Sequence, residues 1–293
     1  DAVYCIVDLH ALTLPKDPEE LRSNTLQLAQ LLMAVGLDPN KSTLFVQSHV
    51  QEHSQLAWLM ECTVSFGELS RMTAFKDKSD RSEFISAGLF TYPALQAADI
   101  LLYDTDLVPV GDDQRQHIEI TRDVAERFNH RFGETFVVPQ HVIPKAGARV
   151  MDLQHPERKM SKSEHSVNGT INVLENPDSV RKKIKRAVTD SDGEVRFDFE
   201  EKAGVSNLLS ILGAAKGIPP SEVATSFERY GDLKAATADA VIELLSPIQE
   251  RFADLQSDPA ETRRLLQVGA DKAREVASAT LTRAQHNCGL LES

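Results

Sequence analysis

The sequence is poor in cysteine and in basic residues, and it contains no long apolar run. Its three cysteines lie far apart and form no Cys-x-x-Cys pair, which argues against a zinc or iron–sulfur site and against a disulfide framework. No apolar stretch reaches the length of a membrane span, and no basic-apolar leader opens the chain. These absences predict a cytoplasmic protein that uses neither a membrane nor a dedicated metal site.

Acidic residues outnumber basic ones, with 44 Asp and Glu against 32 Lys and Arg and a net charge of -12. Such a chain does not coat nucleic acid through bulk electrostatics, although a local basic patch remains possible. One such run consists of Arg181, Lys182, Lys183, Lys185 and Arg186. Taken by itself, a run of this kind is commonly a solvated helix face.

The length of 293 residues and the hydrophobic fraction of 41% favour two packed units. In the first part, expected strands alternate with expected helices, which is typical of a parallel sheet covered on both faces. The strands are expected at residues 3–8, 43–47, 107–110 and 136–139. The helices are expected at residues 18–35, 55–62, 93–103 and from about residue 114 to residue 128.

Several local signals carry these expectations. Asp17 can cap the helix that begins at Pro18, and Pro93 suits the first position of another helix. The only tryptophan, Trp58, is expected to be a core aromatic. Beyond Pro177, long helical periodicity replaces the strand pattern. We therefore expect a domain boundary near residue 173.

The string Lys159-Met160-Ser161-Lys162-Ser163 suits a loop that grips a polyphosphate. Lysine is a point charge on a flexible stem, so two lysines three positions apart can follow phosphates as they move. The serines add hydroxyl donors and leave room for the backbone to approach. An isolated Lys-x-x-Lys pair would be an ordinary basic loop, but the full string resembles the KMSKS motif of class I aminoacyl-tRNA synthetases.

Two further features point to ligand binding on physical grounds. Asp99 stands among apolar residues of a helix, where a carboxylate must find a donor or lose much solvation energy. It could be a satisfied core or cap partner, or it could face a substrate. Gly111, Asp112 and Asp113 stand where a strand ends and a helix begins, which is where open α/β folds bind ligands. A plain capping turn is the alternative there.

Longer stretches are similar to the tryptophanyl-tRNA synthetase family. The likeness is strongest at residues 92–103 and 108–129, and it extends to residues 5–11, 75–79, 187–190 and 205–209. Two departures stand out. The glycine-rich HIGH-type turn of class I synthetases is not found, since residue 1 aligns with the family's second strand, and Gln96 stands where many members have Met.

This resemblance implies a Rossmann-like catalytic domain at residues 1–173, followed by an all-helical, tRNA (anticodon)-binding domain at residues 174–293. Asp99 would accept the indole N–H of tryptophan, and Tyr92 and Gln114 would hold its ammonium and carboxylate groups. The other residues implied around the ring are Val7, His10, Gln96, Val108 and Val110.

The resemblance also implies an ATP site. Gly111, Asp112 and Asp113 would contact the ribose, and the backbone of Val150 would contact adenine. Lys78 and the KMSKS residues Lys159, Met160, Ser161, Lys162 and Ser163 would bind the triphosphate, with Mg²⁺ entering on ATP.

The implied reaction joins L-tryptophan to ATP, gives tryptophanyl-adenylate and pyrophosphate, and transfers tryptophan to its tRNA. The residues implied in tRNA contact are Lys182, Lys183, Lys185 and Arg186. A homodimer is implied, with an insertion at residues 14–88 forming much of the contact. Two alternatives remain: a tyrosyl-tRNA synthetase, and a synthetase-like protein that binds ligands or tRNA without turnover.

Overall fold

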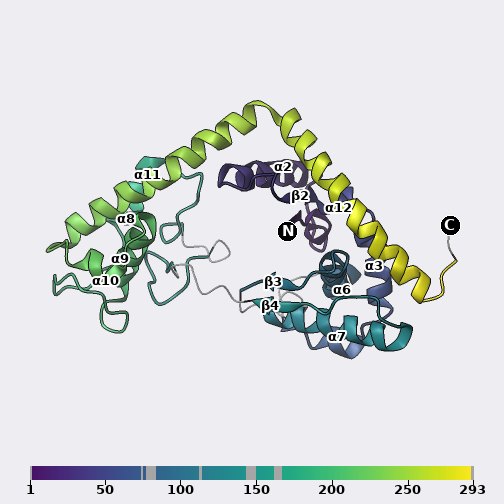
Figure 1. Ribbon diagram of the computed structural model, residues 1–293. Helices are drawn as coiled ribbons and strands as arrows, with labels where there is room; N and C mark the ends of the chain where they lie inside the picture. The colour runs from purple at the N-terminus through teal and green to yellow at the C-terminus, as the bar shows by residue number, and fades with distance from the viewer. Residues whose placement is uncertain are drawn as a thin grey trace. The chain divides into compact units, whose positions relative to one another are not determined.

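The computed structural model (Figure 1) describes residues 2–73, 75–76, 84–111, 114–142, 150–161 and 167–291. The chain forms two compact units. The first consists of Asp1–Pro144 together with Leu255–Ser293, and the second consists of Lys145–Asp254. The sequence placed a boundary at residue 173, but the end of the chain packs with the first unit. The assignment of catalytic and tRNA-binding roles to residues 1–173 and 174–293 stays a prediction.

Within the described part of the first unit, the strands form two parallel pairs. Strand β1 (Val3–Ile6) pairs with β2 (Thr43–Val46), and β3 (Leu107–Pro109) pairs with β4 (Gln140–Val142). Helix α2 (Pro18–Ala34) lies between β1 and β2 in the chain, as a parallel connection requires. As predicted, Asp17 caps this helix, accepting the backbone N–H groups of Glu19 and Glu20 at 3.0 and 2.9 Å.

Helices from distant parts of the chain enclose the core of the first unit. Other helices in the described part of this unit are α1 (Asp8–Ala11), η1 (Gln47–His49), α3 (Glu52–Glu61), α4 (Phe66–Ser70), α6 (Ala87–Leu101), α7 (Arg115–Phe132) and α12 (Pro259–Asn287). Helix α6 packs against α3 and α7, and α12 lies beside β2 and α3 (Figure 1).

Small residues allow α12 to approach β2 closely. A Cβ atom at Gly269 would lie 1.8 Å from the carbonyl oxygen of Leu44, so no larger residue fits without a shift. Ala270, Ala273 and Ala277 are buried on the same helix. This contact ties the last residues of the chain to its first parallel strand pair.

Trp58 is not in the core, contrary to the prediction, because its side chain is 65% exposed. Helix α3 buries His53, Leu56, Ala57 and Met60, which recur at the spacing of one helical face. Trp58 falls outside that face. Helical periodicity therefore decides its position, against the general tendency of tryptophan to be buried.

Pro93 does not begin a helix, as the sequence had suggested, but lies inside α6. The helix begins six residues earlier, at Ala87, because the Ser86 hydroxyl accepts the backbone N–H of Leu89 at 3.1 Å. Proline has no N–H, so α6 lacks one of its internal hydrogen bonds at that point. Pro93 is buried, and packing around it offsets this loss.

The strand expected at residues 136–139 is wrong, and the observed strand β4 begins at Gln140. The side chain of Asn129 binds the backbone just before it. Its Oδ1 accepts from the N–H groups of Thr135 and Phe136, and its Nδ2 donates to the carbonyl of Phe136. A side chain therefore takes the backbone bonds that a neighbouring strand would otherwise make.

The second unit is built from helices around one apolar core. They are α8 (Pro177–Lys185), α9 (Ala203–Lys216), α10 (Pro220–Ala224) and the larger part of α11 (Tyr230–Ser257). This agrees with the helical character predicted beyond Pro177. Among the described residues of the whole chain, no helix is both long and apolar enough to cross a membrane.

Candidate active site

Asp99 lies on α6 with its side chain 11% exposed, and it accepts three hydrogen bonds. His53 Nδ1 and Gln47 Nε2 reach Oδ1 at 2.6 and 2.7 Å, and His10 Nε2 reaches Oδ2 at 2.8 Å. Burial opposes ionisation of this carboxyl group, but the hydrogen bonds from His10 and His53 outweigh burial and lower its pKa. Asp99 is therefore an ionised, buried acceptor.

Tyr92 lies two turns before Asp99 on the same helix. Its hydroxyl is 2.8 Å from Nε2 of His117 on α7, and its ring meets the His10 ring edge-on at 6.2 Å. Burial raises the pKa of Tyr92, so the hydroxyl keeps its proton. Gln96 is half-buried on α6 between Tyr92 and Asp99. The structure thus brings four of the predicted tryptophan residues together, on α6 and at His10.

The other residues predicted to bind tryptophan lie in β3, just after β1 or β3, or at the start of α7. Val7 directly follows β1 and is 44% exposed, and Val108 lies in β3 opposite His141. Val110 follows β3, and its N–H donates to the carbonyl of Val142 at 3.0 Å. The N–H of Gln114 donates to Gly111 at 3.0 Å at the start of α7. Their contact with a substrate ring stays a prediction.

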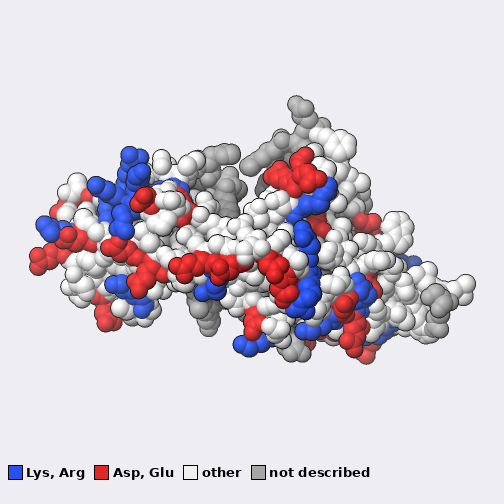
Figure 2. Space-filling view, turned by 90° about the horizontal axis from the view of Figure 1, so that it is seen from above, with Lys and Arg blue, Asp and Glu red and all other residues white. Residues whose placement is uncertain are grey.

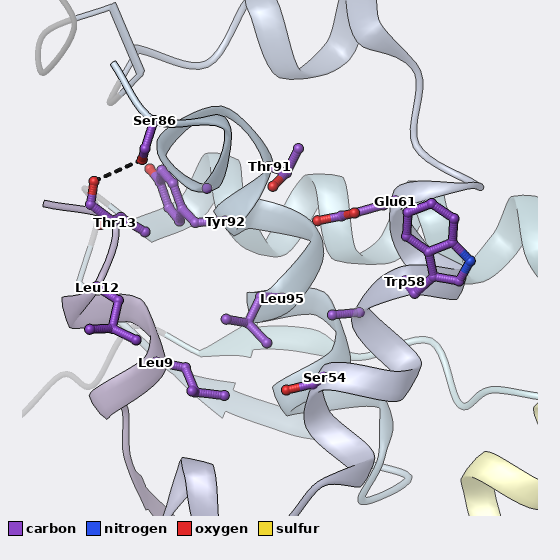
Figure 3. Close-up of a pocket in the computed structure, with 12 residues that line it drawn as sticks. Leu9, Leu12, Thr13, Ser54, Trp58, Glu61, Ser86, Thr91, Tyr92 and Leu95 are labelled. Atoms are coloured by element: carbon purple, nitrogen blue, oxygen red, sulfur yellow. Dashed lines mark hydrogen bonds between the residues drawn. The ribbon is translucent and has the colours of Figure 1, made fainter. Parts of the chain in front are cut away.

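A cavity of about 410 Å³ adjoins Tyr92 (Figure 3). Leu9 and Leu12 approach it from α1 and the residue after it, Leu95 from α6 and Trp58 from α3. Its rim is held where the Ser86 hydroxyl donates to the carbonyl of Thr13 at 3.0 Å. Of the residues predicted to bind tryptophan, only Tyr92 lines this cavity. It is therefore a neighbouring surface hollow rather than the predicted substrate slot.

In the second unit, the first half of the KMSKS string lies on a short hairpin. Met151 and Lys159 form an antiparallel bridge, and the N–H of Met160 donates to the carbonyl of Val150 at 3.0 Å. Ser161 follows, and its carbonyl accepts from the Thr170 hydroxyl at 3.2 Å. The predicted residues Lys78, Asp112, Asp113, Lys162 and Ser163 lie outside the described residues.

The helical part of this unit fixes the base of that hairpin. Asn207 on α9 is 1% exposed; its Oδ1 accepts from the N–H of Met151 at 2.9 Å and its Nδ2 donates to the carbonyl of Met151 at 2.8 Å. An apolar groove of about 530 Å³ runs between the hairpin residues Val150 to Ser161 and helices α9 and α11. The polyphosphate string therefore starts from a rigidly held strand.

The basic run on α8 divides into two kinds of residue. Lys183 is buried, and its Nζ lies 2.6 Å from Glu175 Oε1 and 2.7 Å from the carbonyl of Thr170. Lys182, Lys185 and Arg186 are exposed. Figure 2 shows basic side chains gathered over this unit beside acidic ones. Of the four residues predicted to contact tRNA, Lys183 faces inward, so the other three form the available surface.

Comparison with known proteins identifies the family of this chain. A profile described as "tRNA synthetases class I (W and Y)" matches residues 1–246. The chain belongs to this family. The α/β, Rossmann-like fold class with a helical part, predicted from the sequence, is confirmed by the solved structures that this class I synthetase resembles.

Its relatives include proteins named for tryptophan. A "Tryptophan–tRNA ligase" of Caldanaerobacter subterraneus is 54% identical over 99% of this chain and 89% of that protein. Another, of Leifsonia xyli, is 53% identical over 100% of this chain and 88% of that protein.

Among solved structures, the tryptophanyl-tRNA synthetase of Mycoplasma pneumoniae superposes with a TM-score of 0.87 at 39% identity, covering 98% of this chain and 88% of that one. That of Campylobacter jejuni, complexed with ADP and tryptophan, has a TM-score of 0.84 at 33% identity, covering 98% of this chain and 89% of that one. A tyrosyl-tRNA synthetase of Aeropyrum pernix matches at 22% identity with a TM-score of 0.64, covering 91% of this chain and 79% of that one, which shows only a shared fold.

The sequence did not indicate the roles of four residues of this synthetase. Gln47 and His53 bind Asp99, Tyr103 binds His53, and Asn207 holds the KMSKS hairpin. One signal was available: Tyr103 follows Asp99 by four positions, so the two can share a helix face. Nothing in the local pattern pairs His53 or Gln47 with Asp99.

Proposed function

We propose that this protein is a tryptophan–tRNA ligase, which activates L-tryptophan with ATP and loads it onto tRNA(Trp). The ionised, buried carboxylate of Asp99, which contacts His10, carries the proposal, because a buried acceptor suits a ring with one N–H group. The names of relatives more than half identical to this chain support tryptophan over tyrosine.

The reaction needs no side-chain nucleophile. The tryptophan carboxylate attacks the α-phosphate of ATP in line, which forms tryptophanyl-adenylate and releases pyrophosphate. The acceleration then comes from holding the two substrates in place and from neutralising charge on the phosphates. Lys159, Lys162 and Lys78 supply cations, and the hairpin anchored by Asn207 directs Lys159.

ATP is proposed to contact the residues around Gly111 and the KMSKS string, with adenine at the backbone of Val150. Mg²⁺ enters with the triphosphate, since such ions are held largely by substrate phosphates and water, and it neutralises phosphate charge. Within the described ranges, no group of three or more His, Cys, Asp or Glu side chains is placed to hold a cation by itself.

The exposed residues Lys182, Lys185 and Arg186 contact tRNA phosphates in this scheme. They lie at the end of one short helix, with Arg186 as its C-cap, in an otherwise acidic protein, so their attraction for RNA is local. The three free thiols, Cys5, Cys62 and Cys288, suit the cytoplasm, where such an enzyme would work.

The enzyme is proposed to act as a homodimer through the segment of residues 14–88. This segment exposes large aromatic side chains: Trp58 is 65% exposed, Phe66 77% and Phe84 69%. Exposed aromatic side chains of this kind suit a contact site with another protein. The hollow beside Trp58 in Figure 3 offers a concave part of such a surface.

Amino-acid-dependent exchange of pyrophosphate into ATP tests the proposal. We expect exchange with tryptophan and none above background with tyrosine, followed by charging of tRNA(Trp). Equal or greater exchange with tyrosine would favour the tyrosyl alternative. Binding of tryptophan and ATP without any exchange would favour the non-catalytic alternative.

A further inference from the structure

A chain of two hydrogen bonds connects Asp99 through His53 to Tyr103. His53 is fully buried; its Nδ1 lies 2.6 Å from Asp99 Oδ1, and its Nε2 lies 2.8 Å from the hydroxyl of Tyr103. The His53 and Tyr103 rings are 5.6 Å apart, and both pack against Phe45. The chain of hydrogen bonds therefore links α3 to α6 and to the turn after α6, and Phe45 of β2 packs against both rings.

With His53 neutral, the protons in this chain have one arrangement. Asp99 is ionised and can only accept, so His53 Nδ1 carries a hydrogen and donates it. Burial, and then the charge of neighbouring acidic groups, raises the pKa of Tyr103, so its hydroxyl keeps its proton and donates it to His53 Nε2. Tyr103 thereby fixes which nitrogen of His53 carries the hydrogen.

The two oxygens of Asp99 are occupied unequally. A carboxylate oxygen accepts about two hydrogen bonds. Oδ1 receives one from His53 and one from Gln47, so it is full. Among the described residues, only His10 donates to Oδ2, which leaves one acceptor position there. An indole ring has a single N–H, so its donor matches that one position.

We propose that His53 and Tyr103, with Gln47, are positioning residues for tryptophan selection. They saturate Oδ1 and prevent the carboxylate from turning about its Cβ–Cγ bond. The open lone pair of Oδ2 then stays aimed at the indole nitrogen. This inference rests on the proposed function of Asp99 as the indole acceptor, and it adds that the selectivity of Asp99 depends on residues that never touch the substrate.

The test compares tryptophan with its analogue in which sulfur replaces the indole nitrogen, using pyrophosphate exchange by the whole protein. The ratio of kcat/KM for the two substrates is the readout. His53→Leu should lower this ratio about tenfold, the effect of one hydrogen bond of ordinary strength. Tyr103→Phe, which removes only the hydroxyl, should lower it about threefold. The loss should appear in the KM for tryptophan, with the KM for ATP unchanged.

Two further variants separate positioning from packing. His53→Asn keeps a donor close to the place of Nδ1 and should restore most of the ratio. Phe45→Leu loosens the packing of both rings but removes no hydrogen bond, so it should lower the melting temperature and leave the ratio intact. If Phe45→Leu changed the ratio as much as His53→Leu, or if Asn failed to restore it, the positioning role would be wrong.

The Asp99→Ala variant shows whether a failure concerns the positioning role of His53 and Tyr103 or the contact between Asp99 and the indole N–H. If Asp99→Ala loses the preference for tryptophan while His53→Leu and Tyr103→Phe retain it, only the positioning role fails. If Asp99→Ala itself retains the full preference, the indole contact fails, and the positioning role fails with it.

Discussion

The side-chain amide of Asn207 holds both backbone polar groups of Met151, at 2.9 and 2.8 Å, and so joins α9 to the hairpin that begins the KMSKS string. Asn207→Leu would leave a buried N–H and a buried carbonyl without partners, which costs about 1–3 kcal/mol. We expect a lower melting temperature and a slower activation step, with tryptophan affinity little changed. Thermal unfolding gives the melting temperature, and single-turnover adenylate formation gives the activation rate. The control is Asn24→Ala on the exposed face of α2. Unchanged activation in a folded Asn207→Leu protein would show that the anchor does not matter for catalysis.

Lys159→Ala should lower the activation rate much more than it weakens tryptophan binding. The ammonium group is proposed to meet phosphate charge that develops in the transition state, and such interactions affect kcat rather than substrate affinity. The same result is expected for Lys162→Ala. Arg158→Ala is a matched control, since Arg158 adjoins the string but lies 3.6 Å from Glu157 in an exposed pair. A collapse of tryptophan affinity with an intact rate at saturation would contradict this role.

Reversing charge at Lys182, Lys185 and Arg186 should raise the KM for tRNA and leave adenylate formation unchanged. Each lost phosphate contact should also reduce, by about 1, the slope of the logarithm of the tRNA binding constant against the logarithm of the salt concentration. Lys216→Glu, an exposed lysine at the end of α9, serves as the control. If aminoacylation at several salt concentrations stays unchanged, this surface is only a solvated helix face.

Lys183 should behave differently from its neighbours, since its ammonium group is buried against Glu175. Lys183→Met leaves that carboxylate without its cation and should destabilise the second unit, while the salt dependence of tRNA binding stays the same. Thermal unfolding beside the same aminoacylation series tests this. If Lys183→Met weakened tRNA binding but left the melting temperature unchanged, Lys183 would belong to the surface that contacts tRNA.

Acid should weaken the contact between Glu68 and Arg127. The hydrogen bond from Arg127 lowers the pKa of Glu68 to about 2. In an unfolded chain, the pKa of a glutamate is about 4.3. The pair therefore stabilises the fold above about pH 4.3, and this contribution disappears as the pH falls toward 2. Glu68→Gln should lose about 1 kcal/mol at pH 7 and show a flatter decline between these pH values. Urea unfolding across that range measures it, with Glu19→Gln as an exposed control; parallel declines in wild type and Glu68→Gln would refute the assignment.

Local signals predicted the elements whose ends are set by neighbouring residues. Asp17 and Pro18 mark the start of α2, and β1 to β3 begin within the apolar runs where they were expected. Pro93 misled because Ser86 supplies an earlier cap, and Trp58 misled because residue type was weighed above helical spacing. Such competing signals are resolved only when the packing partners are known.

The candidate site, too, could be predicted only in part from the sequence. Asp99 could be recognised from the sequence, because an acid within an apolar helix needs a partner. Its actual partners, His10, Gln47 and His53, lie 89, 52 and 46 positions away in the chain, and only the fold brings them to the same carboxylate. The packing of α12 against β2 is likewise tertiary: the small residues of α12 indicate a close contact but not its partner.

The contact between Asp99 and the indole N–H is the central claim, and one measurement tests it most directly. Pyrophosphate exchange by Asp99→Ala is measured with tryptophan and with the analogue in which sulfur replaces the indole nitrogen. In the wild-type protein, the analogue leaves the open acceptor position on Asp99 Oδ2 without a donor, so it should be activated at least about tenfold less efficiently. In Asp99→Ala, activation of tryptophan should fall and the two substrates should become nearly equal. Full discrimination in Asp99→Ala would contradict the claim and leave Asp99 only as a structural partner of His10, Gln47 and His53.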